Sequence, residues 1–152
     1  MSTNFTGASD IRIAQLVDRL FRRIHAGLHS RAPEFDKDNI GPGGSMILLT
    51  IEELQPTPIH ALVTHLARDK SQITRALKSL ETKGMIKRQT AEDDGRVVVV
   101  ALTDTGQHMV EQLQVVLAET IGEILGPLAA EDHAVLETLL RRVVPPPGRA
   151  QS

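Results

Sequence analysis

Apolar residues recur along this chain at the spacing of one helix face, and the pattern predicts six helices. Intervals of three and four residues place side chains on a single side of a helix, where they can be buried. The second predicted helix is apolar on most of its sides, which indicates that it is buried. The six predicted helices span about residues 10–30, 43–54, 58–67, 69–83, 104–126 and 131–144.

The predicted helix at residues 69–83 carries local signals at both of its ends. Asp69 is a good N-cap, and Gln72 stands three residues later, where a capping box has Glu or Gln. Lys83 places a cation near the negative end of the helix dipole, and Gly84 can adopt the left-handed conformation that ends many helices. The apolar face of this helix comprises Ile73, Ala76, Leu77 and Leu80.

Two strands joined by an acidic turn are predicted directly after this helix. The first spans Met85 to Gln89, and the second spans Arg96 to Leu102 and contains four consecutive valines. The turn has the sequence AEDDG, in which Gly95 is available for a positive φ. The order helix, strand, turn, strand is the outline of a winged helix-turn-helix, with residues 58–67 as the first helix of the motif.

The remaining signals mark where the other helices begin and end. Residues 31–44, with two prolines and three glycines, are predicted to form a linker. Thr57 followed by Pro58 predicts a helix start, and Thr103 is predicted to cap the long helix after the hairpin. The run Pro145-Pro146-Pro147 ends the last helix.

The polar face of the predicted helix 69–83 mixes hydrogen-bonding and cationic side chains: Gln72, Thr74, Arg75 and Lys78. A helix of this size fits the major groove of DNA, where Arg bonds guanine and Gln reads adenine. We expect this face to meet bases and nearby phosphates, with backbone contacts from Lys70 and Arg88 and a minor-groove contact from Arg96. Each residue taken singly fits a solvated basic helix beside an ordinary hairpin, but the ordered set favours DNA binding.

Basic charge is concentrated in the same stretch. From Arg68 to Arg96 the chain has eight Lys and Arg against five Asp and Glu, a balance of +3, whereas the whole chain carries −2. The rest of the chain is therefore at −5. A basic patch on the predicted motif is the electrostatic footprint of a nucleic-acid partner.

Three stretches resemble the MarR family of winged-helix regulators: ITRALKSLETKG in the predicted recognition helix, DDGR at the hairpin tip, and VVVALTDTG leading into the next helix. Their spacing also fits, and the resemblance extends over nearly the whole chain. It implies a mainly α-helical protein in which residues 40–103 form a winged helix-turn-helix lobe of three helices and a β-hairpin wing. The N- and C-terminal helices, in residues 1–39 and 104–152, would form a helical dimerisation lobe.

The resemblance also implies a function. It predicts a homodimer that binds double-stranded DNA at a palindromic site and regulates transcription, most often as a repressor. By the same resemblance, the carboxylate of Asp94 holds the guanidinium of Arg96 across the turn and readies it for the DNA groove. A small-molecule effector bound between the lobes would change the spacing of the two recognition helices and so the affinity for DNA.

An effector pocket, where the family has one, would lie between the first, second and fifth helices. Its expected lining residues are His25, His29, Ser45, His108 and Met109. The family usually has an aromatic residue near the start of the second helix, and Ser45 stands closest to that position here. A pocket without an aromatic wall is therefore expected.

His25 and His29 also have the spacing of metal ligands on a helix, so a metal-responsive regulator is an alternative. No second pair of ligands is evident in the sequence, and we predict no metal and no cofactor. The other alternative is a winged-helix module that binds proteins and has lost DNA binding.

Composition excludes several classes of protein. A length of 152 residues with 41% hydrophobic content indicates one compact unit, and 2% aromatic residues indicate an aliphatic core. The absence of cysteine excludes disulfides, a thiol redox sensor and Cys-ligated zinc. No signal peptide and no apolar run of about 18 residues is evident, so a soluble cytoplasmic protein is expected. Motifs such as G-x-S-x-G, the Walker loop and H-E-x-x-H are missing, so no enzymatic activity is predicted.

Overall fold

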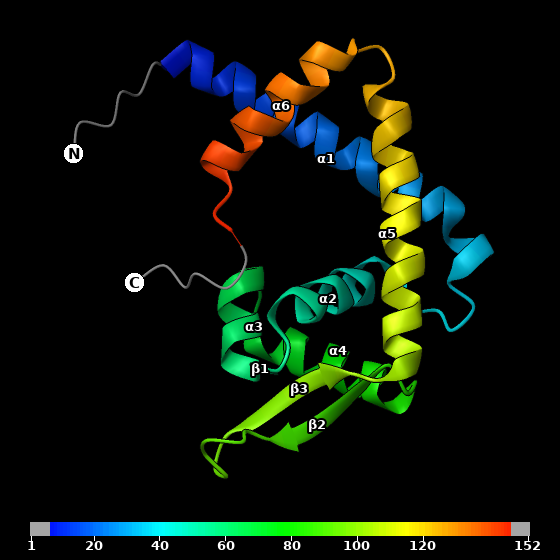
Figure 1. Ribbon diagram of the computed structural model, residues 1–152, viewed down its shortest axis with the longest axis vertical. Helices are drawn as coiled ribbons and strands as arrows, with labels where there is room; N and C mark the ends of the chain where they lie inside the picture. Colours follow the sequence, from blue (N-terminus) through cyan, green and yellow to red (C-terminus); the bar gives the residue numbers. More distant parts are fainter. Residues whose placement is uncertain (1–6, 147–152) are drawn as a thin grey trace.

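The structure, a computed structural model, describes residues 7–146 and has the mainly helical fold that was predicted (Figure 1). All six predicted helices and the hairpin are present. In chain order the elements are α1 (Gly7–Phe35), α2 (Gly41–Leu54), β1 (Thr57–Pro58), α3 (Ile59–Leu66), α4 (Lys70–Thr82), β2 (Ile86–Thr90), β3 (Val98–Leu102), α5 (Asp104–Leu125) and α6 (Ala130–Val143).

The winged-helix part, residues 41–102, is built around α2. Helices α3 and α4 and the sheet pack against α2, and the first half of α5 closes the same core. Its fully buried side chains are all aliphatic or Met, as the composition predicted. The largest of them are Ile47, Leu48, Ile51, Leu62, Ile73, Leu77, Leu80, Met85, Val100 and Val110.

The sheet has three antiparallel strands in the order β1-β3-β2. The hairpin register pairs Ile86 with Leu102 and Thr90 with Val98, and β1 adds Thr57 opposite Val100. The expectation that Thr57 caps a helix is wrong. Its backbone belongs to β1, Thr57 is buried, and the N-cap of α3 is Pro58 in an extended conformation.

Helix α1 is longer than predicted, because it runs through Pro33 to Phe35 instead of ending near Ser30. The predicted linker at residues 31–44 is therefore reduced to a short loop between Phe35 and Gly41. Two contacts hold the extra turns in place. Arg31 forms ion pairs with Glu119 and Glu123 of α5, and Phe35 packs against the core. These contacts offset the backbone hydrogen bond that Pro33 cannot donate.

Helices α1, α5 and α6 form the other part of the molecule (Figure 1). Helix α5 extends away from the winged-helix part, α1 crosses it, and α6 follows after a sharp turn. At the crossing, a Cβ on Gly27 would lie 2.5 Å from the Thr120 methyl carbon, so the close approach depends on a residue without a side chain. Neither α1 nor α6 has a buried residue within the single chain.

Within residues 7–146, no single helix is long and apolar enough to cross a membrane. Helices α5 and α6 reach that length and apolar content only when taken together, and they are bent by 119° relative to each other.

Candidate nucleic-acid interface

Helix α4 is fixed by its apolar face and by caps at both ends. Ile73, Leu77 and Leu80 are buried in the core. The Asp69 carboxylate accepts hydrogen bonds from the Ser71 hydroxyl at 2.6 Å and the Ser71 amide at 3.4 Å. The Ser71 hydroxyl, followed by the Ser71 amide, holds the pKa of Asp69 below its ordinary value. The N-cap prediction is confirmed, and the carboxylate is held by Ser71.

The predicted end of α4 is confirmed in detail. Gly84 adopts φ of +75°, its amide donates to the Glu81 carbonyl at 3.0 Å, and the Met85 amide donates to the Leu80 carbonyl at 2.9 Å. These two hydrogen bonds form a Schellman motif, which satisfies the last carbonyl groups of a helix. The rigid stop places the chain directly into β2.

Opposite the buried face, α4 presents an exposed polar face. Its predicted residues all lie on this exposed face: Lys70, Gln72, Thr74, Arg75 and Lys78. The Thr74 hydroxyl donates to the Lys70 carbonyl at 2.8 Å, so its oxygen remains an acceptor for outside donors. The exposed side of α4 therefore offers an amide, a hydroxyl oxygen and three cations.

An ion pair joins α4 to the wing. The Arg88 Nε donates to Glu81 Oε2 at 2.8 Å, and both side chains are partly exposed. Arg88 was expected to contact the DNA backbone, and its partner Glu81 was not singled out from the sequence. A separation of seven residues across a turn gives no local signal for such a pair.

The tip of the wing differs from the prediction. The Asp94 Oδ1 accepts from the backbone amide of Arg96 at 3.0 Å, which forms an Asx turn. Among residues 7–146 no ion pair joins these two side chains, so the predicted clamp on the guanidinium is wrong. The expected positive φ at Gly95 is also not used; among the described glycines it occurs at Gly41 and Gly84. Asp94 thus shapes the turn, and the Arg96 side chain is left exposed.

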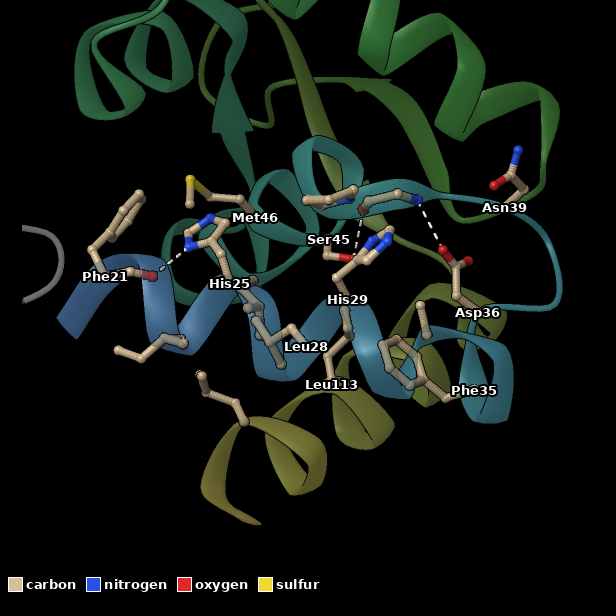
Figure 2. A pocket seen from close by; sticks show the side chains of 16 residues that line it. Phe21, His25, Leu28, His29, Phe35, Asp36, Asn39, Ser45, Met46 and Leu113 are labelled. Carbon is tan, nitrogen blue, oxygen red and sulfur yellow. Dashed lines mark hydrogen bonds between the residues drawn. The ribbon is translucent and has the colours of Figure 1, made fainter. Parts of the chain in front are cut away.

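A second feature is a cavity of about 380 Å³ between α1, α2 and α5 (Figure 2). His25 and His29 project from α1 toward Ser45 and Met46 of α2. The lining also includes Leu113 and Leu117 of α5. Three of the five residues expected at an effector pocket, His25, His29 and Ser45, therefore line one space.

The other two expected residues lie elsewhere, and this part of the prediction is wrong. Met109 is buried in the winged-helix core at 6% exposure. His108 is exposed on the surface of α5, 3.8 Å from Glu111. Helix α5 reaches the cavity one to two turns later than expected, because its first turns are occupied in closing the core.

The cavity is mostly apolar, with polar groups at its edges. The His25 Nδ1 lies 3.0 Å from the Phe21 carbonyl oxygen, and the Ser45 hydroxyl donates to the Gly41 carbonyl at 2.8 Å. No Lys or Arg is among the described lining residues. Phe21 and Phe35 of α1 both line the cavity, so the expectation of a pocket without an aromatic wall is wrong. Across residues 7–146 no cluster of three His, Asp or Glu side chains could hold a metal ion.

Comparisons with known proteins agree with this geometry. The model of the MarR family matches residues 45–98, from α2 to the start of β3. An uncharacterised HTH-type transcriptional regulator of Bacillus subtilis, YdgJ, is 35% identical over 75 residues, which are 49% of this chain and 46% of that protein. The chain thus spans about half the length of this curated relative.

Solved structures are similar over more of the chain. E. coli MarR in its apo form is 26% identical, with a TM-score of 0.73 over 87% of this chain and 96% of MarR. A MarR mutant complexed with operator DNA has a TM-score of 0.70, again at 26% identity, and the match covers 95% of this chain and all of that one. Bordetella bronchiseptica BpsR, solved to explain regulation of its DNA binding by 6-hydroxynicotinic acid, has a TM-score of 0.69 at 18% identity over 87% of this chain and 98% of BpsR.

The quoted motifs, the winged helix-turn-helix around α2 and the similarity along most of the chain point the same way. Residues 45–98 match the MarR family, and most of the chain has the fold of E. coli MarR.

Proposed function

We propose that the chain is a transcriptional regulator that binds double-stranded DNA sequence-specifically with α4 and the wing. The exposed polar face of α4 carries this proposal. That face lies directly opposite a fully buried apolar face, so α4 is held rigidly while Gln72, Thr74, Arg75 and Lys78 remain available to bases and nearby phosphates. A similar protein, E. coli MarR, has been solved with operator DNA. We take the site of action to be the cytoplasm, where this DNA target lies.

The residues around α4 take supporting roles in this proposal. Lys70 at the first turn and Arg88 on β2 contact phosphates on either side of the groove. Arg96 enters the minor groove from the tip of the wing, where the Asx turn made by Asp94 fixes its backbone. This binding requires no cofactor, and the chemistry is recognition rather than catalysis.

The working unit in this proposal is a homodimer. Residues 1–39 and 104–152 form its dimerisation lobe and residues 40–103 its DNA-binding lobe, although residues 1–6 and 147–152 lie outside the described range. Support comes from apolar side chains on α1 and α6 that this protomer leaves about half exposed or more: Ile11, Ile13, Leu16, Val17, Val135, Leu139, Leu140 and Val143. Burying them against a second copy removes this apolar surface from water. A two-fold axis then presents two copies of α4 to a palindromic site.

The direction of regulation in this proposal is repression, relieved by a small molecule in the cavity. Support comes from the size and apolar lining of the cavity, which match a small organic ligand. The BpsR structure concerns the regulation of that protein's DNA binding by 6-hydroxynicotinic acid. His25, His29 and Ser45 are the polar groups that orient the ligand.

A selection of genomic DNA fragments by the purified protein, repeated at two salt concentrations, tests the proposed function. We expect enrichment of a palindrome with half-sites about one helical turn apart, and an affinity that falls steeply with salt. Absence of enrichment at both salt concentrations would overturn DNA binding. Enrichment of a site without symmetry would overturn the homodimer alone.

A further inference from the structure

The loop between α1 and α2 is both a wall of the cavity and a tightly organised turn. Asp36 and Asn39, together with Phe35 and Gly41 on either side, line the cavity. The Asp36 carboxylate accepts hydrogen bonds from the amides of Ile40 at 2.7 Å and Gly41 at 2.9 Å. Asn39 and Gly41 have positive φ of 54° and 75°. The two hydrogen bonds to Asp36 tie the ends of the turn together, so pressure on one side moves the loop as a unit.

The same loop is bonded to the end of α4. The Lys83 Nζ donates to the Asn39 carbonyl oxygen at 2.8 Å, across 44 positions of sequence. Lys83 is the C-cap of α4, and its side chain is only partly exposed. This is a charge-assisted hydrogen bond, which depends on direction more strongly than the apolar contacts that otherwise hold α4.

A second contact reaches the other end of α4. Arg68 precedes the N-cap Asp69, and its guanidinium Nη2 lies 4.0 Å from the sulfur of Met46. Met46 lines the cavity at a side away from Asn39 (Figure 2). Both ends of α4 therefore contact residues of the cavity wall, one through a strong hydrogen bond and one through a weak one.

We propose that the Lys83–Asn39 hydrogen bond is the main link through which occupancy of the cavity changes the position of α4, an inference that rests on the proposed function. An occupant pressing on Asp36 and Asn39 displaces the loop, and Lys83 carries this displacement to the C-terminal end of α4. The Arg68–Met46 contact acts at the opposite end as a weaker pivot. Coupling of this kind requires that the occupied and empty cavities favour different positions of α4.

A substitution can stand in for the ligand. Ala32 lines the cavity one helical turn before Asp36, and its carbonyl accepts from the Asp36 amide at 2.7 Å. The variant Ala32→Phe places a phenyl ring in the cavity against the loop. Ala32→Leu is the smaller alternative where thermal unfolding shows that the Phe variant does not fold.

A double-mutant cycle then tests the link. The dissociation constant for the selected DNA duplex is measured by fluorescence anisotropy for wild type, Ala32→Phe, Lys83→Met and the double variant. Lys37→Met is the matched control, because Lys37 is an exposed lysine of the same loop and its replacement removes the same charge. We expect the filled cavity to weaken DNA binding about tenfold in wild type and in the Lys37→Met background, and about twofold or less in the Lys83→Met background.

Two outcomes would overturn the link while leaving the proposed function intact. One is an equal effect of Ala32→Phe with and without Lys83, and the other is no effect of Ala32→Phe in folded wild-type background. A wild-type protein that binds no DNA contradicts the proposed function itself, so the two failures are distinguishable.

Discussion

Gly106 in the first turn of α5 lies against the backbone of Met85, so closely that a Cβ on it would be 1.9 Å from the Met85 carbonyl oxygen. The sequence LTDTG, which ends at this glycine, forms several hydrogen bonds at this junction between α4 and α5. The Thr103 hydroxyl oxygen accepts from the Gly106 amide at 3.1 Å and donates to the Gly84 carbonyl at 2.5 Å. The motif therefore fastens the start of α5 to the chain leaving α4, so that these two helices meet in one fixed corner.

Replacing Gly106 by alanine is expected to destabilise the protein. The added carbon meets backbone rather than a flexible side chain, so α5 or the Met85 segment must shift, at a cost of about 2–4 kcal/mol. Urea denaturation of the variant measures this cost. Gly122→Ala in the same helix is the control, because nothing lies within 4 Å of its added carbon. It should raise stability by about 0.5–1 kcal/mol, and equal effects of the two substitutions would contradict the close contact.

Stability should depend on pH through Asp69. Its pKa is lowered in the folded protein, so its contribution is present above the unfolded pKa of about 4 and is lost as pH falls through the lower folded value. The difference in unfolding free energy between wild type and Asp69→Asn should thus be constant near neutral pH and shrink in acid. Urea denaturation across this range measures it. Asp38→Asn, in the exposed loop before α2, serves as the control, and a difference for Asp69→Asn that grows in acid would refute the lowered pKa.

Arg75 and Arg96 are expected to differ in what they contribute to DNA binding. Arg75→Ala should cost about 1–3 kcal/mol and relax the preference for one base, because a base contact is lost. Arg96→Ala should weaken binding to all sequences and reduce the slope of log affinity against log salt by about 1. Binding to the selected site and to its single-base variants measures both effects. An unchanged affinity for either variant removes that residue from the interface.

Breaking the ion pair between Glu81 and Arg88 should strengthen DNA binding. Glu81→Gln frees the Arg88 guanidinium for a phosphate and removes a negative charge beside α4, so affinity at low salt should rise about threefold to tenfold. Protein stability should change by less than about 1 kcal/mol, since both side chains are partly exposed. The gain should be smaller when Arg88 is already replaced by Met. A full gain in the double variant would show that Arg88 does not contact DNA.

A charge in the apolar stripe of α6 should separate the proposed dimer. Leu140 is 49% exposed in the protomer. Leu140→Arg places a cation where the second copy would bury it. Burying this charge should cost the dimer roughly several kcal/mol of association free energy. Sedimentation velocity should show a monomer, and binding to the palindrome should be lost. Glu137→Arg, away from the stripe on α6, should leave the dimer intact. If both variants are monomeric, the interface covers more of α6 than its apolar stripe.

Local chemistry explains how much of the fold could be predicted. The caps at Asp69 and Thr103 and the left-handed glycine at Gly84 act over one turn of chain, so their residue types alone specify them. Distant partners explain the errors. Pro33 should end a helix by local rules, but Arg31 and Phe35 on either side of it are held by α5 and by the core.

The candidate sites follow the same division. The polar face of α4 could be predicted because it is the complement of an apolar stripe in one helix. The cavity is made by three helices. Which turn of α5 reaches it depends on how many residues at the start of α5 are buried in the core of the winged-helix part. Met109 was therefore placed wrongly, while Leu113 and Leu117 were missed. The Asp94 carboxylate can bind either the guanidinium or the backbone amide of Arg96, and the sequence does not distinguish the two.

The aromatic side of the cavity has a consequence for spectroscopy. The chain contains neither tryptophan nor tyrosine, so the protein has almost no intrinsic fluorescence in the near ultraviolet. Phe21 lines the cavity, and its ring lies tilted by 43° against the ring of His25, with centroids 4.1 Å apart. A tryptophan introduced at Phe21 would be the sole emitter in the whole chain, and a ligand that enters the cavity would change the polarity around the indole and so its emission. The protein itself would then report a ligand whose identity is unknown, without a labelled compound and without DNA.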